Sequence, residues 1–119
     1  MNHSSPGART EIPPGTLDML ILKTLSHARQ LHGFEIAEAI AASSAHVFTV
    51  EEGSLYPALQ RMLIKGWLTG EWGRTSDNRR ARYYRLTAAG KRQLEQEVRG
   101  YQRAADAIAR VLGPAAVPA

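Results

Sequence analysis

Apolar side chains along this chain recur first at helical spacing, then at strand spacing, and finally at helical spacing again. The first helix is expected to begin at about Thr16, with Asp18 in its first turn. Its core face consists of Leu17, Leu20, Ile21, Thr24, Leu25 and Ala28. A second helix opens at Gly33 and carries a narrower apolar face at positions 36, 37, 40 and 41. The β-prone run at 46–50 is compatible with a single strand.

A third helix is expected from Ser54 to Lys65. Proline is tolerated in the first turn of a helix, where its missing N–H has no helical partner, so Pro57 fixes the start of this helix. Gly66 is expected to end it as a C-cap glycine. Its core face has helical spacing and consists of Leu55, Leu59, Met62 and Leu63. At ~100° per residue, Ile64 falls on the opposite, outward face.

Two runs of strand-forming residues, 67–74 and 81–86, flank turn-forming residues at 75–80 and predict an antiparallel hairpin. The last helix is capped by Thr87, runs to about Leu112 and contains Gly100, which costs ~1 kcal/mol relative to alanine. Its apolar positions repeat about every 3.5 residues, the spacing of a coiled-coil seam. They are Leu94, Val98, Tyr101, Ala105, Ile108 and Leu112. Because such a helix would extend beyond a domain this small, we expect the seam to form a homodimer interface.

This order of elements is typical of a winged helix-turn-helix, in which the third helix enters the major groove of DNA and the hairpin, or wing, contacts the backbone or minor groove. We therefore predict a mainly α fold with a small antiparallel β-hairpin. The expected organisation is a flexible N-terminal arm at 1–14, a winged helix-turn-helix at 15–87, a dimerisation helix at 88–112 and a flexible tail at 113–119.

Positive charge is concentrated where this fold would meet DNA. Residues 61–92 hold nine Lys or Arg side chains against two acidic ones, whereas the whole chain of 119 residues has a net charge of only +4. Positive charge clustered on one helix and the following hairpin favours a polyanionic partner, with double-stranded DNA first.

Other functional classes lack support in the sequence. The longest apolar runs fall far short of the ~20 residues that span a bilayer, and the N-terminus lacks the pattern of a signal peptide. The chain has no cysteine, and its four histidines show no ligand spacing, so no metal or other cofactor is expected. No nucleophile motif or phosphate-binding glycine loop is present. We expect a cytoplasmic protein that is neither membrane-bound nor an enzyme.

The candidate DNA-binding residues lie on the third helix and the wing. They are Ser54, Tyr56, Gln60, Arg61, Lys65, Arg79, Arg80 and Arg82. In the major groove Arg pairs with guanine and Gln with adenine; for Gln60 and Arg61, phosphate contact and a solvated polar face are the alternatives. A hydroxyl at the start of the helix can donate to a phosphate, but Ser54 could also be a helix cap and Tyr56 a packed side chain.

The wing arginines are the strongest candidates, because cations around one turn repel one another unless a polyanion is bound. Strand alternation places Arg82 and Tyr84 on one face of the wing and Tyr83 and Arg85 on the other, so all four cannot contact DNA together. Trp67 and Trp72 lie in or beside the hairpin. They could line a pocket for a small apolar or aromatic effector near the dimer interface, or they could anchor the wing onto the helices.

Several motifs, in order, resemble the PadR family of bacterial transcriptional regulators. They are GTLD at 15–18, HGFEI at 32–36, GSLYPAL at 53–59, GWL at 66–68, EWG at 71–73 and NRRARYYRLTAAG at 78–90. The resemblance covers about residues 15–112. It implies a dimeric repressor of a dyad-symmetric operator, often released by a small molecule, in the subgroup with a single C-terminal helix. Leu63 and Ile64 depart from the family pattern, which usually has acidic or polar residues there.

Two other functions remain compatible with the same residues. The first is a ligand-sensing or protein-interaction module that keeps the fold without sequence-specific DNA binding. The second is an RNA-binding winged helix, which would prefer a structured RNA to a duplex operator. Replacing the wing residues Arg79 and Arg80 by alanine should leave the first of these functions unchanged.

Overall fold

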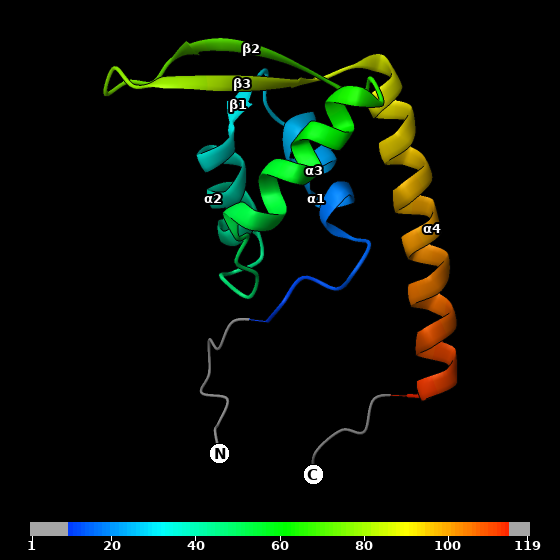
Figure 1. The fold of residues 1–119 in the computed structure, drawn as a ribbon. Coiled ribbons are helices and arrows are strands. Elements are labelled where there is room, and N and C mark those ends of the chain that lie inside the picture. Colours follow the sequence, from blue (N-terminus) through cyan, green and yellow to red (C-terminus); the bar gives the residue numbers. More distant parts are fainter. Residues whose placement is uncertain (1–9, 115–119) are drawn as a thin grey trace, which may run out of the picture.

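Four helices and three short strands make up the part of the chain that the computed structural model describes, residues 10–114. In chain order they are α1 (Leu17–Ser26), β1 (Leu31–His32), α2 (Gly33–Ser43), α3 (Glu52–Ile64), β2 (Leu68–Arg74), β3 (Arg80–Leu86) and α4 (Ala88–Leu112). The predicted mainly α, winged helix-turn-helix fold is confirmed. The sheet lies across one end of α1, α2 and α3, and α4 runs down one side and past the other helices (Figure 1). Most of the predicted flexible arm and tail, at 1–9 and 115–119, lies outside the described residues.

The sheet has the order β1-β3-β2, and both neighbouring pairs are antiparallel. The edge strand β1, Leu31–His32, pairs with Tyr84 and Tyr83 of β3. In the sequence β1 lies between α1 and α2, and a strand of only two residues is too short to give a recognisable hydrophobic pattern.

The prediction of a strand at 46–50 is wrong. In that segment Phe48 makes one isolated bridge, to Thr10, and belongs to no sheet. Ala45 and His46 have positive φ angles of 53° and 63°, which turn the chain sharply at the end of α2. Phe48 and Val50 then pack against the core. Phe48 and Val50 are thus used for packing and not for strand pairing.

Helix α3 begins at Glu52, two residues before the predicted start. Pro57 consequently lies inside the helix and not in its first turn. Its ring removes the hydrogen bond that would reach back to the carbonyl of Gly53. Because Gly53 is exposed, that carbonyl lies at the surface, where the missing bond costs least.

The core is built from one face of each of the first three helices and is closed by the sheet. Its fully buried side chains are Ile21, Leu22, Leu25, Ile36, Leu55, Leu59, Met62 and Leu68. Tyr84 of β3 joins this cluster, with 6% of its surface exposed. The predicted core face of α3 is therefore confirmed, with Leu63 half-buried at its margin, whereas Ile64 is 77% exposed, as its outward position predicted.

The junction between the wing and α4 is fixed by hydrogen bonds to Thr87. The Thr87 hydroxyl accepts from the backbone N–H of Gly90, at 3.0 Å, and so caps α4 as expected. Thr87 Oγ1 also lies 2.7 Å from the carbonyl oxygen of Gly66, and its backbone N–H donates to Trp67. Gly66 itself has a φ of 78°, the left-handed conformation predicted for a C-cap glycine.

Candidate nucleic-acid interface

The wing formed by β2 and β3 has two different faces. In an antiparallel pair, residues directly opposite each other point to the same side of the sheet. Gly70 lies opposite Tyr84, Trp72 opposite Arg82, and Arg74 opposite Arg80. Because Tyr84 is buried against the helices, these side chains belong to the helix-facing side. Tyr83 and Arg85 point to the other side, as the alternation predicted.

Trp72 organises the arginines on the helix-facing side of the wing. The Arg80 guanidinium lies 4.3 Å from the centre of the indole ring, and the Arg82 guanidinium lies 5.8 Å from it. Both distances are within the range of a cation–π interaction. The indole is 58% exposed, so the stack faces solvent and not the core. The two cations are thus held in place beside a flat aromatic surface.

Arg82 is the more enclosed of these two arginines. Its guanidinium crosses Gly70, where an added Cβ would come within 2.6 Å of Arg82 Nε. Glycine at this position therefore makes room for the side chain. Arg82 Nε is buried and lacks a hydrogen-bond partner among residues 10–114. A group that accepts this N–H would remove an unfavourable buried donor.

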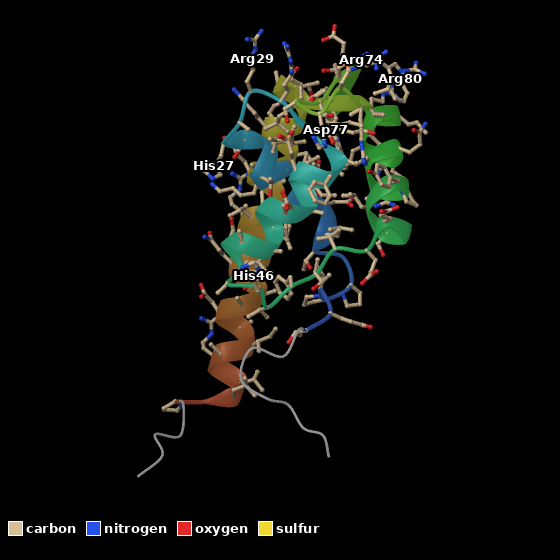
Figure 2. All side chains as sticks on the ribbon, turned by 90° about the vertical axis from the view of Figure 1, so that its left-hand side faces the viewer. His27, Arg29, His46, Arg74, Asp77 and Arg80 are labelled. Atoms are coloured by element: carbon tan, nitrogen blue, oxygen red, sulfur yellow. The ribbon has the colours of Figure 1, made fainter. Side chains whose placement is uncertain are left out.

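The tip of the wing brings further cations together (Figure 2). Arg74 and Arg80 form the last cross-strand pair before the turn, an arrangement of like charges that destabilises a hairpin. Arg74 donates to the carbonyl of Asn78 at 3.1 Å. Arg79 lies 3.3 Å from Asp77, but both side chains are strongly exposed, so this ion pair leaves Arg79 available.

Helix α3 presents a mostly uncharged outward face. Ser54 and Gln60 are exposed, and Ser54 lines a cleft with residues of α1 and α4, on the opposite flank from Tyr56. Tyr56 is 45% exposed, and its ring packs so closely on Gly33 that a Cβ there would lie 2.6 Å from the hydroxyl oxygen. Tyr56 is therefore packed against α2 on one side and accessible at the surface on the other. The structure thus places the hydroxyl at the N-terminal end of α2.

Arg61 of α3 and Lys65, the residue that directly follows α3, make contacts within the chain. Arg61 Nη2 donates to Asp18 Oδ1 of α1 at 2.8 Å. Lys65 lies over the ring of Trp67, 4.7 Å from its centre. Both side chains remain at the surface, but each has a protein partner that DNA would have to share or replace.

A cleft of about 990 Å³ lies between the wing and the N-terminal ends of α2 and α3. It gathers the predicted residues Tyr56, Arg79, Arg80 and Arg82, together with Trp72. Its opposite wall contains Phe34, which is 63% exposed and was missed in the sequence. The sequence signal was the HGFEI run, since an aromatic residue directly after a helix-opening glycine lies outside the apolar periodicity of α2.

Tyr84 lies at the buried end of this cleft. Burial raises the pKa of its hydroxyl above the ordinary value of 10.0, and the nearby Arg82 guanidinium partly offsets this effect. The hydroxyl is therefore neutral at physiological pH. It adds no negative charge to a cleft whose wing side is cationic.

The two tryptophans proposed for an effector pocket lie apart. Trp72 lines the cleft beneath the wing, whereas Trp67 precedes the other end of β2 and packs against the core. For Trp67 the alternative of core packing is thus observed.

The predicted dimer residues change from half-buried to exposed along α4. Leu94 packs against the core, and Val98 and Ala105 are half-buried. The exposed members are Tyr101 (54%), Ile108 (58%) and Leu112 (78%). The second half of the seam thus lies open to solvent in the single chain.

Residues 10–114 contain neither a cluster of metal ligands nor a membrane-spanning helix. No cluster of three or more His, Asp or Glu side chains there is arranged to hold a metal ion. No helix in that range is both long enough and apolar enough to cross a membrane.

Comparison with known proteins points in one direction. Residues 21–96 match the sequence profile of the transcriptional regulator PadR-like family. The chain is 37% identical over 95 residues to the transcriptional regulator Rv3488 of Mycobacterium tuberculosis, covering 77% of this chain and 81% of that protein. An uncharacterised protein of Lysinibacillus sphaericus is 30% identical over 100 residues, covering 84% of this chain and 91% of that protein.

Solved structures share the fold. A PadR family transcription regulator from Clostridium difficile superimposes with a TM-score of 0.70 at 30% identity, covering 83% of this chain and all of that chain. A transcriptional regulator from Clostridium thermocellum gives 0.72 at 26% identity, covering 79% and 90%. Bacillus subtilis PadR in complex with operator DNA gives 0.62 at 22% identity, covering 72% of this chain and 48% of that chain, a likeness of fold.

Proposed function

The chain belongs to the PadR-like family of transcriptional regulators, and on this premise we propose that it is a homodimeric repressor that binds an inverted-repeat operator. In this proposal α3 enters the major groove, and the wing contacts the sugar–phosphate backbone or the adjacent minor groove. Bacillus subtilis PadR, which shares this fold, has been crystallised in complex with operator DNA, and this supports DNA as the partner.

The observation that carries the proposal is the cationic wing above the cleft. Arg74 and Arg80 repel each other across the hairpin, and the exposed indole of Trp72 holds the guanidinium groups of Arg80 and Arg82 close to one another. Phosphate oxygens would relieve this repulsion, because they accept hydrogen bonds and carry negative charge. Phosphate contacts of this kind supply much of the affinity of a DNA-binding protein and make it fall steeply with salt.

Sequence discrimination is assigned to α3. Gln60 is exposed on its outward face and can pair with adenine N6 and N7, a contact worth about 1–3 kcal/mol of discrimination. Ser54 and Tyr56 are exposed on opposite flanks of α3, and in this proposal their hydroxyls donate to phosphates. A single such domain would bind loosely, because it reads only a few base pairs.

A second copy of the chain is the partner that fits α4. Ile108 and Leu112 are exposed on a seam that continues from the half-buried Val98. Burying each such side chain contributes roughly 1.5–3 kcal/mol, and a two-fold axis counts every contact twice. Two recognition helices held in this way would lie about 34–36 Å apart, one turn of the duplex.

Release by a small apolar or aromatic effector is part of the proposal. The ligand would alter the distance or angle between the two wings. Trp67 and Trp72 lie apart in one chain, so the pocket proposed near the dimer interface is not lined by both indoles of the same subunit.

The experiment that tests the proposal is a binding titration on the DNA upstream of the protein's own gene, at several salt concentrations. We expect a dimer to bind an inverted repeat there with an affinity that decreases as salt increases. Salt-sensitive binding without sequence preference would reduce the protein to a basic domain. An absence of binding would contradict the proposal and favour an interaction module. Stronger binding to a structured RNA than to any duplex would favour the RNA-binding alternative.

A further inference from the structure

Arg61 was expected to contact DNA, but its nearest charged partner is on α1. Its Nη2 lies 2.8 Å from Asp18 Oδ1, an ion pair that joins residues 43 positions apart in the sequence. The Asp18 side chain is only 23% exposed, and that of Arg61 is 54% exposed. The carboxylate is therefore partly shielded from water, which makes the pair stronger than one between two fully exposed side chains.

The ion pair lies on the flank of α3 that faces away from the wing. Tyr56 and the wing arginines line the cleft on one side of the helix. Arg61 and Asp18 instead line a second cleft, of about 790 Å³, between α1, α3 and α4. Gly100 and Tyr101 of α4 form its opposite wall. Arg61 thus faces the elements that would carry the dimer contact.

The buried residues of α3 lie along one stripe, which anchors the helix to the core along a single line. Leu55, Leu59 and Met62 form that stripe. The Asp18–Arg61 pair attaches the helix at a point to one side of the stripe. From this geometry we propose that Asp18 is a positioning residue for DNA recognition: it holds α3, through Arg61, at a fixed orientation relative to α1 and α4.

This inference rests on the proposed function and sharpens it. In this account Arg61 is a structural link, and the exposed Gln60 reads the bases. Fixing α3 before DNA arrives avoids an ordering cost at binding, which is how preorganisation raises affinity. Each dimer contains the pair twice, so its effect on operator affinity counts twice.

The test compares Asp18→Ala, Arg61→Ala and the charge-swapped protein that carries Asp18→Arg and Arg61→Asp. We expect either single change to weaken operator binding by about three- to twentyfold, as loss of two partly exposed ion pairs permits. We expect Arg61→Ala to leave the slope of log affinity against log salt unchanged, because no phosphate contact is lost. The swapped protein should recover most of the affinity, since it restores the pair with the charges exchanged.

The sign of the Asp18 effect separates this account from direct contact of Arg61 with DNA. If Arg61 bound a phosphate, Asp18→Ala would free it and raise the affinity, whereas Arg61→Ala would lower the salt slope by about one unit per subunit. In that case the swapped protein would bind worst, because it places an acid against DNA. Any of these results, or an Asp18→Ala protein that binds as the wild type does, overturns the inference.

Asp106→Ala is the matched control for the change in net charge, since it removes one exposed acid from the far half of α4. Urea unfolding of every variant shows whether a weaker binder is simply less folded. The milder Asp18→Asn, which keeps the side-chain size, is used if the alanine variant unfolds. A wild-type protein that binds no duplex contradicts the proposed function and the inference together. Wild-type binding with unaffected variants contradicts the inference alone.

Discussion

At the scale of single residues, Gly90 determines how closely α4 approaches the wing. An added Cβ would overlap the carbonyl oxygen of Trp67 and lie 2.7 Å from a methyl carbon of Leu86. The hydrogen bonds from Thr87 hold this backbone in place. We expect Gly90→Ala to lower the free energy of unfolding by about 1–3 kcal/mol, the usual cost of overpacking, as measured by urea denaturation.

Gly100→Ala is the natural control, because it makes the same change in the same helix. An added Cβ there meets no atom within 4 Å in the described chain. Alanine should therefore stabilise α4 by about 0.5–1 kcal/mol through helix propensity alone. Equal effects of the two alanine substitutions would contradict the packing assigned to Gly90.

Tyr84 gives the stability a dependence on pH. Burial raises the pKa of its hydroxyl above 10.0 in the folded chain, whereas the unfolded chain loses the proton near that ordinary value. The stabilisation is therefore complete below about pH 10, and it is lost as the pH rises through the folded-state pKa. Tyr84→Phe should make the free energy of unfolding decrease less steeply between about pH 9 and 11. Parallel curves for the two proteins would show that Tyr84 does not carry this effect.

At the scale of elements, the wing and α3 should respond differently to mutation. Replacing Arg79 or Arg80 by alanine should weaken binding about equally for all DNA sequences and reduce the salt slope by about one unit per lost contact. Gln60→Ala should instead change the preference at one base pair by about 1–3 kcal/mol. Titrations of operator and single-base variants at several salt concentrations measure both quantities.

Arg110→Ala is the control for lost positive charge, because Arg110 is exposed in the last turn of α4, far from the wing. It should change neither quantity by more than a surface substitution does. If the wing variants changed base preference and left the salt slope intact, the assignment of base recognition to α3 and of phosphate contact to the wing would be contradicted.

Comparing the predicted with the observed helices and strands shows which of them have a signal in the local sequence. The four helices and the hairpin follow from apolar periodicity, turn residues and the caps at Thr87 and Gly66, all of which are local signals. The strand at 31–32 has no local signal, because its two residues form a strand only through pairing with the edge of β3. The run at 46–50 gave a false signal, since its apolar side chains serve packing and the φ angles of Ala45 and His46 prevent an extended path.

The same limit applies to the site. Alternation along β3 correctly separated Arg82 from Arg85, and the wing cations were visible in the sequence. The partner of Arg61 was not, because it depends on how α1 and α3 pack. The partners of Trp72 were not, because they depend on the exact register of the hairpin. Phe34 was missed because its exposure beside the wing is a tertiary property.

At the scale of the whole molecule, α4 gives the single chain an elongated shape, with extents of 54 × 33 × 22 Å. Its far half continues beyond the other helices with Ile108 and Leu112 exposed (Figure 1). We expect Ile108→Glu to yield a monomer in sedimentation experiments, because it places a charge in the seam of both subunits. Ile64→Glu is the matched control: Ile64 is 77% exposed but lies on α3, so the dimer should persist. Loss of the dimer in both variants, or in neither, would contradict the assigned seam.

In the proposed dimer, two recognition helices held at a fixed distance determine which DNA site is bound. The direct measurement is the affinity of the protein for a series of duplexes in which two inverted half-sites, defined by footprinting, are moved apart one base pair at a time. We expect one sharp maximum, at a separation of about 10–10.5 base pairs between half-site centres, and weak binding when one half-site is removed. An affinity that is independent of spacing, or equal for one and two half-sites, would contradict this expectation.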